Sequence, residues 1–177
     1  MNDLRKNLIS INAILLPRIL TQVCRDKFSP LYGSFDRNWW HYKIRDFSSL
    51  ILQQGGYSLY CYYKNSDEFK NNNIILNLIK ASAYFWNKQA KKYGAFEEYY
   101  PWEKGYPPLA FSTLAIAKLV EADVVKFDKV SCGLKVASKQ LLNRFETEAS
   151  NQQIAGLAAL GVIKKIAPKL VNCRIFE

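Results

Sequence analysis

Charged residues divide the chain into uncharged and amphipathic segments that alternate along its length. Residues 47–63, 105–117 and 149–163 carry no charged side chain. Each of these segments is apolar around most of a helix circumference, which is typical of helices that are covered on all sides. Each is also shorter than the ~18–20 residues that a membrane-spanning helix requires. We therefore predict three buried helices and no membrane span.

The two segments between these runs show helical periodicity with a single apolar face. The first face consists of Ile75, Leu78, Ile79, Ser82 and Trp86. The second consists of Phe127, Val130, Leu134, Ala137, Leu141 and Phe145, with lysines on the opposite side of the helix. The alternation predicts an all-α fold in two layers, in which inner helices are covered on all sides and outer helices on one.

A short motif occurs twice and predicts a structural repeat. Tyr32-Gly33-Ser34-Phe35-Asp36 recurs as Tyr93-Gly94-Ala95-Phe96-Glu97. Bulky aromatic residues follow both copies, namely Trp39, Trp40 and Tyr42 in the first and Tyr99, Tyr100 and Trp102 in the second. A weaker third copy is predicted from Phe145-Glu146 onwards. Fixed-period similarity indicates a repeat architecture, and the unit here is an outer helix followed by an inner helix.

The repeated loops are expected to gather at one end of the bundle. Each loop joins the end of an outer helix to the start of an inner helix, so residues 28–46, 93–107 and 146–152 should form one rim. Binding and catalytic residues are often found in loops that rigid helices hold in place. We therefore look for a functional site on this rim.

The chain is long enough for a single domain with a substantial core, since it has 177 residues. Eight Gly and six Pro are too few for the frequent turns of a many-stranded β fold. We expect an N-terminal helical segment over residues 1–27, bent or restarted at Pro17, then repeated hairpins over 28–167 and a tail over 168–177.

Charge and cysteine content narrow the range of functions. The net charge of +10 attracts polyanions, but the lysines that we can place lie on outer helix faces, so nucleic-acid binding ranks last. The cysteines are Cys24, Cys61, Cys132 and Cys173, and with one histidine they do not have zinc-site spacing. Cys61 and Cys132 are predicted to be buried free thiols, which suits a cytoplasmic protein with no cofactor.

The two loop motifs resemble a known family. The string from Tyr32 to Phe47 resembles the opening of α/α-toroid proteins encoded near bacterial surface-polysaccharide genes. Residues 98–103, followed by Ala110-Phe111, resemble the second loop of these proteins, and Asn151-Gln152 resembles the third. The family is similar to the N-terminal toroid of heparinase II/III-type polysaccharide lyases and, more distantly, to six-hairpin glycosidases. The resemblance covers roughly residues 28–165.

This resemblance implies a partial (α/α) toroid of about three helical hairpins, with inner and outer helix layers, where a complete ring has about six. It also implies a lyase-like role for Tyr100 in proton transfer, with Arg37 or Arg45 binding a uronate carboxylate. His41 is the only histidine and is a candidate general base or charge neutraliser. The alternative for His41 and Tyr100 is structural packing among the neighbouring aromatic rings.

The acidic and aromatic residues of the rim allow two further interpretations. A glycosidase needs two carboxylates, and the candidates are Asp36, Glu97, Glu98, Glu103 and Glu148. Repeated acidic residues also cap helices or bridge loops, and this is the alternative for Asp36 and Glu97. Sugar-stacking candidates are Trp39, Trp40 and Trp102. Further substrate contacts are expected from Glu98, Tyr99, Asn151 and Gln152.

We therefore expect a carbohydrate-active protein that acts on or binds a bacterial polysaccharide, and the resemblance implies an acidic one. If the protein is catalytic, the reaction at the rim is elimination or hydrolysis. The alternative is a non-catalytic half-toroid that binds a glycan or a partner chain in polysaccharide biosynthesis. An open ring would have an exposed helix edge, so a second copy or another chain that completes the toroid is an expected partner.

Overall fold

The protein is helical throughout the part of the chain that its computed structural model describes, residues 2–35 and 48–171. The α-helices there are α1 (Asn2–Gln22), α2 (Gly55–Asn65), α3 (Asn73–Tyr93), α4 (Tyr106–Glu121), α5 (Phe127–Asn143) and α6 (Ser150–Ile166). Two 3₁₀ helices accompany them, η1 (Leu50–Gln54) and η2 (Pro168–Leu170). The described residues form no β-strand, and their only β-pairing consists of two isolated β-bridges, Val23–Phe35 and Phe96–Lys104. The predicted all-α class is confirmed.

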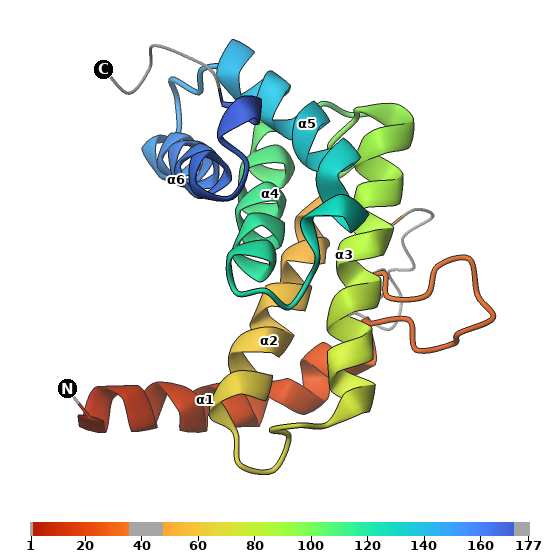
Figure 1. Ribbon diagram of the computed structural model, residues 1–177, viewed down its shortest axis with the longest axis vertical. Helices are drawn as coiled ribbons and strands as arrows, with labels where there is room; N and C mark the ends of the chain where they lie inside the picture. The colour runs from red at the N-terminus through yellow and green to blue at the C-terminus, as the bar shows by residue number, and fades with distance from the viewer. Residues whose placement is uncertain (1, 36–47, 172–177) are drawn as a thin grey trace.

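The helix α4 lies in the middle of the bundle, between α6 and α3 in the view of Figure 1. The helix α4 packs most extensively on α6 and also contacts η1 and α2, whereas α3 packs mainly on α5. Alternate helices along the chain are therefore neighbours in space. The core lies between the pair formed by α4 and α6 and the pair formed by α3 and α5. There the Trp86 indole on α3 donates a 2.8 Å hydrogen bond to the Ser112 hydroxyl on α4.

The apolar faces predicted for α3 and α5 are the buried faces. All five residues of the α3 face are buried. On α5, Val130, Leu134, Ala137 and Leu141 are buried, but Phe127 and Phe145 are exposed. Phe127 is the first residue of α5 and Phe145 lies beyond its last residue, so both are at the ends of the buried face. Asn72 starts α3 by accepting bonds from the Ile74 and Ile75 amides, as an N-cap does.

The helix α1 runs across the bottom of the view in Figure 1, transverse to α2 and α3, and it packs on α2. It continues through Pro17 as one helix, so of the bend or restart predicted at this residue, the restart is excluded. Only Leu16 is deeply buried among its described side chains, and Leu4, Leu8, Ile11 and Ile14 are exposed.

The repeated motif has the same backbone form in both copies. Gly33 and Gly94 both have positive φ, +84° and +58°, and this region of the Ramachandran plot favours glycine. Phe35 and Phe96 are both fully buried. The third copy departs from the pattern, because Arg144 stands at the end of α5 in extended conformation and Phe145 is 75% exposed.

The three predicted inner helices differ in burial. Ten of the residues in α4 are buried. By contrast, α6 presents an open face on which Ile154 is 64% exposed and a Cβ added to Gly161 would meet nothing within 4 Å. The prediction that α6 is covered on all sides is therefore wrong, because no other described element lies over this face.

The cysteines are arranged differently from the prediction. Cys24 is buried, Cys61 is half-buried and Cys132 is exposed, and all three are free thiols. Cys132 lies beside the buried positions of α5, Val130 and Gly133, and points away from them into solvent. The prediction that Cys132 is buried is therefore wrong, and Cys173 lies outside the described residues.

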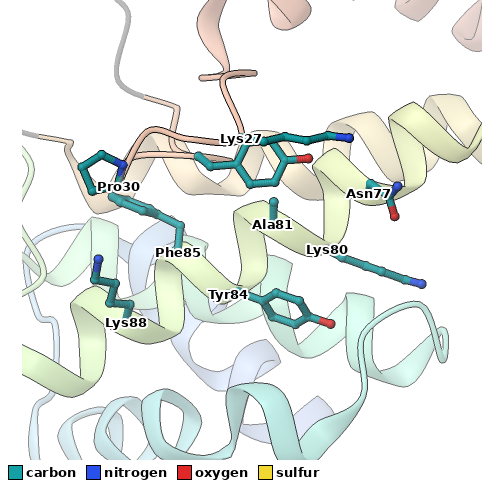
Figure 2. A pocket seen from close by; sticks show the side chains of 9 residues that line it. Lys27, Pro30, Asn77, Lys80, Ala81, Tyr84, Phe85 and Lys88 are labelled. Carbon is teal, nitrogen blue, oxygen red and sulfur yellow. The ribbon is translucent and has the colours of Figure 1, made fainter.

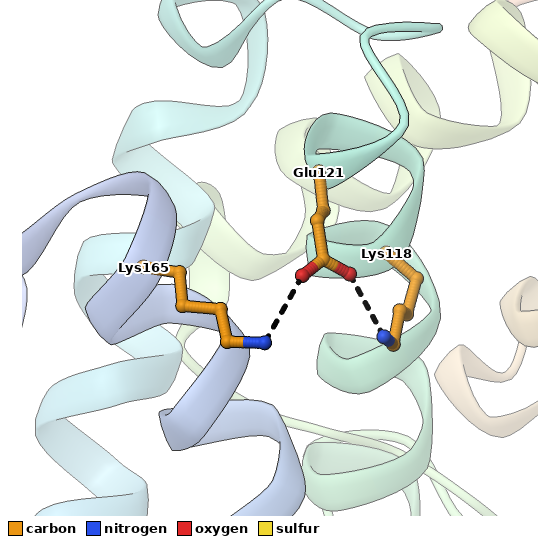
Figure 3. A network of polar contacts seen from close by, with 3 residues as sticks. All are labelled: Lys118, Glu121 and Lys165. Atoms are coloured by element: carbon orange, nitrogen blue, oxygen red, sulfur yellow. Dashed lines mark hydrogen bonds and ion pairs between the residues drawn. The ribbon is translucent and has the colours of Figure 1, made fainter.

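Ion pairs between two lysines and one glutamate connect the end of α4 to α6 on the surface (Figure 3). Glu121 accepts from Lys118 at 2.8 Å and from Lys165 at 3.5 Å. These ion pairs lower the pKa of Glu121, the Lys118 hydrogen bond most strongly. No helix of the described residues has both the length and the apolar character needed to span a bilayer.

Candidate functional site

The loop between α3 and α4 is a compact turn that the backbone closes on itself. Phe96 is its buried anchor, and its carbonyl accepts from the Gly105 amide at 2.9 Å. The bridge between Phe96 and Lys104 brings the two ends of the loop together. Residues 97–103 are therefore held out from the bundle as a closed turn, which we call the rim turn.

Two glutamates hold the rim turn from within. The Glu103 carboxylate accepts from the amides of Glu98, Tyr99 and Tyr100 at 3.0, 2.8 and 3.4 Å. The Glu97 carboxylate accepts from the Trp102 amide at 2.7 Å. The hydrogen bond from Tyr99 is the main reason that the pKa of Glu103 lies below its usual value. Both carboxylates therefore serve as acceptors for the backbone of the turn.

The rim turn presents three aromatic side chains to solvent. Tyr99, Tyr100 and Trp102 are 66%, 72% and 64% exposed. Trp102 has a positive φ of 68°, which is uncommon for a bulky residue and is stabilised by the Glu97 hydrogen bond to its amide. Large exposed aromatic residues on a braced backbone are typical of binding surfaces, because stacking on them costs little side-chain entropy.

Hydrogen bonds join the rim turn to the neighbouring loops. The Glu97 carbonyl accepts from the Ser49 hydroxyl and the Leu50 amide, both at 3.0 Å. On the other side, the Arg144 guanidinium donates to the Lys104 carbonyl at 2.8 Å. The rim turn is therefore joined to the start of η1 through Ser49 and Leu50, and the loop that contains it is joined to the end of α5 through Arg144.

A basic hollow lies beside the rim turn. It is lined by Gly94, Lys104, Gln140 and Arg144 and has a volume of about 550 Å³. The Gln140 side chain donates to the Gly94 carbonyl at 2.6 Å. The Nη1 nitrogen of Arg144 is buried and has no hydrogen-bond partner in the described part of the chain. A buried donor without an acceptor is costly, so this guanidinium favours an anionic ligand group.

A cluster of polar side chains lies next to the hollow and contacts Arg144. The Arg144 guanidinium lies 5.7 Å from the centre of the Tyr106 ring. The Tyr106 hydroxyl donates to the Gln153 side chain at 3.0 Å, and the same Gln153 oxygen accepts from the Glu146 amide at 2.9 Å. Burial raises the pKa of Tyr106, an effect that Arg144 opposes and Glu146 reinforces. The phenol therefore stays protonated and acts as a donor.

The structure describes about half of the residues predicted for the site. Tyr99, Tyr100, Trp102, Glu98 and Glu103 lie together on the rim turn. The other predicted residues of the first loop lie outside the described residues; they are Asp36, Arg37, Trp39, Trp40, His41 and Arg45. The predicted arrangement around His41 therefore stays a prediction.

The predicted substrate contacts of Asn151 and Gln152 stay a prediction. Asn151 is exposed and Gln152 is half-buried, and the inward contacts belong to Gln153. Sequence reasoning also missed Tyr106 and Arg144. For Gln153 the sequence did contain a signal. This residue is three positions before Gly156 and seven before Leu160, so it lies on the helix face that these two residues pack against the core.

The described residues contain no group of three or more histidine, cysteine or acidic side chains that could hold a metal ion. No protein-family model, curated protein or solved structure shows significant similarity to this chain. The fold class and the rim geometry are therefore the basis for assigning a function.

Proposed function

We propose that the protein binds an acidic carbohydrate chain at the rim. The observation that carries the proposal is the rim turn, on which Tyr99, Tyr100 and Trp102 are exposed and Glu97 and Glu103 fix the backbone. Flat aromatic rings stack on the apolar faces of sugar rings. Lys104 and Arg144 stand beside them and supply positive charge for a carboxylate or sulfate on the chain.

Binding without cleavage is the form of this function that the geometry favours. A glycosidase needs two carboxylates directed at the substrate, about 5–9.5 Å apart. The Glu97 and Glu103 carboxylates instead accept hydrogen bonds from backbone amides of their own turn. The lyase-like alternative depends on His41, which lies outside the described residues.

We also propose that the helices form part of an α/α toroid. The support is the contact pattern, in which α4 packs on α6 and on α2, whereas α3 packs on α5. This pattern suits an inner set and an outer set. The open face of α6, with Ile154 and Gly161, is where a second copy or a partner chain would continue the ring.

A binding measurement tests the carbohydrate proposal. Isothermal titration against polygalacturonate and heparin, with dextran as the neutral comparison, should show binding to the acidic chains only. Tyr100→Ala and Trp102→Ala should each weaken it about tenfold, equivalent to about 1.4 kcal/mol. Ile14→Ala is the control matched for exposure, because Ile14 is 78% exposed and lies on α1, outside the three predicted rim loops.

Thermal melting of each variant separates lost binding from lost folding. Equal affinity of the wild type and both rim variants would contradict the proposal. Ultraviolet absorbance of unsaturated uronate, recorded in the same samples, would rise if the protein were a lyase. Loss of that signal in His41→Ala would then favour the catalytic alternative.

A further inference from the structure

A second pocket lies on the outer side of the molecule, between the loop that follows α1 and the middle of α3 (Figure 2). Its volume is about 480 Å³, within the range of small-molecule sites. The residues that line it are Lys27, Pro30, Tyr32, Asn77, Lys80, Ala81, Tyr84, Phe85 and Lys88. None of them belongs to the rim turn or to the basic hollow.

The pocket concentrates positive charge. Lys27 comes from the loop, and Lys80 and Lys88 come from α3, two turns apart on one face. No acidic residue lines the pocket. The ion pairs seen in the described part of the chain, such as those of Lys118 and Lys126, do not involve any of the three pocket lysines. An anionic ligand group would meet little competition.

The floor of the pocket is apolar. Ala81 and Phe85 are buried beneath it, Pro30 stands at one side, and the Tyr84 ring is 40% exposed along it. Figure 2 shows the Lys80, Asn77 and Lys27 side chains reaching toward the same end of the pocket, with Tyr84 below them. A ligand that fills this space therefore has a flat apolar body and a charged end.

Hydrogen-bond chemistry distinguishes this ligand from a sugar. Sugar hydroxyls are donors as well as acceptors, and unpaired donors are costly to bury. The side chains that line the pocket offer few acceptors, namely the Asn77 carbonyl and the hydroxyls of Tyr32 and Tyr84. Phosphate oxygens need only donors, and lysine is a common phosphate ligand.

The loop wall of the pocket is held in place before any ligand arrives. The Cys24 amide donates to the Ser34 carbonyl at 2.8 Å, and the Gly33 amide donates to the Cys24 carbonyl at 2.9 Å. Gly33 touches α3 so closely that an added Cβ would lie 2.4 Å from the Ala81 carbonyl carbon. The distance between Lys27 and the α3 lysines is therefore set by the fold.

We propose that this pocket binds a phosphorylated ligand with a flat aromatic body, the chemistry of a nucleoside diphosphate. The phosphates are bound by Lys27 and Lys80 beside Asn77, and the aromatic body lies over Ala81 and Phe85 beside the Tyr84 ring, with Lys88 at the opposite end of the pocket. This site shares no residue with the rim turn or the basic hollow, and its ligand differs in class from the carbohydrate proposed there.

Titration calorimetry with ADP, UDP, pyrophosphate and uridine tests the proposal. A nucleoside diphosphate should bind more tightly than pyrophosphate or the nucleoside alone. Both Lys27→Ala/Lys80→Ala and Tyr84→Ala should weaken it about tenfold or more, equivalent to about 1.4 kcal/mol. The charge-matched control is Lys70→Ala/Lys91→Ala, which removes two exposed lysines outside the pocket.

Three results would overturn the proposal. They are the absence of binding heat with either nucleotide, equal weakening in the control variant, and pyrophosphate binding as tightly as the nucleotides. Equal weakening would show attraction to the overall charge of the protein. Since Tyr100→Ala should leave nucleotide binding unchanged, failure at one site is distinguishable from failure at the other.

Discussion

Glu103 shows how one side chain fixes the geometry of the rim turn. Its carboxylate accepts three amide hydrogen bonds, and the pKa of the group is lowered as a result. A lowered folded-state pKa means that the stabilisation is complete above the unfolded-state pKa, about 4.3, and is lost as the pH falls through the folded-state pKa. The rim turn is therefore sensitive to acid.

We expect Glu103→Gln to lower the free energy of unfolding at neutral pH by about 1 kcal/mol, because bonds to a charged acceptor are stronger than bonds to a neutral one. The difference from the wild type should shrink at acidic pH, where the wild-type carboxylate becomes protonated. Urea unfolding at pH 7 and pH 3 measures both quantities. Glu68→Gln, at an exposed position, should show no such difference. A gap that widens in acid would exclude this account.

Single residues of the site were predictable only where local sequence determines them. The aromatic cluster at Tyr99, Tyr100 and Trp102 follows from the repeated motif, and the structure exposes it as a binding surface requires. The role of Glu103 was not predictable, because its partners are backbone amides of a turn whose conformation the sequence does not specify. Arg144 was missed because its hollow forms between two loops that are distant in sequence.

At the scale of the helices, the contact of α3 with α5 depends on a glycine. The Gly133 amide donates to the Asn87 side chain at 2.7 Å. A Cβ at Gly133 would lie 2.7 Å from the Trp86 ring and 3.2 Å from the Asn87 Cα. The two helices therefore approach closely because no side chain separates them at this point.

We expect Gly133→Ala to destabilise the protein by about 1–3 kcal/mol, because overpacking here outweighs the gain in helix propensity. Gly161→Ala is the matched control on α6, where a Cβ meets nothing within 4 Å. This change should stabilise the protein by up to about 1 kcal/mol through helix propensity alone. Thermal melting of both variants decides the point, and two shifts in the same direction would contradict the packing argument.

Helices were the most predictable level of the structure. The periodic faces of α3 and α5 were read from apolar spacing, because those faces pack on neighbours at every turn. The burial of α6 was not predictable in this way. A helix without charged residues looks buried in sequence, but α6 has small and apolar residues on a face that no described element covers.

At the scale of the whole molecule, positive charge dominates the surface. The net charge is +10, and the ion pairs of the described residues lie among exposed or partly exposed side chains such as Lys126 and Asp123. Exposed pairs contribute little to stability. Mutual repulsion among the lysines is therefore expected to outweigh these pairs at low ionic strength.

We expect the melting temperature to rise by about 2 °C between ~10 mM and ~150 mM sodium chloride, as the screening length falls from about 30 Å to about 8 Å. Potassium chloride should act equally, because screening depends on ionic strength. Differential scanning calorimetry at fixed pH measures the change. A falling melting temperature would instead show that pairs such as Lys118–Glu121 outweigh the repulsion.

The order in which the helices contact one another bears on how the chain folds. In the described part of the chain, the main contacts join α-helices that are at most two places apart in chain order, as α1 with α2 and α4 with α6. When contacts are this local, each helix is stabilised by its near neighbours, as the units of nearly one-dimensional repeat arrays are. Cooperativity then weakens toward the ends, so α1 can open and close as a separate unit while α3 to α6 keep their native packing.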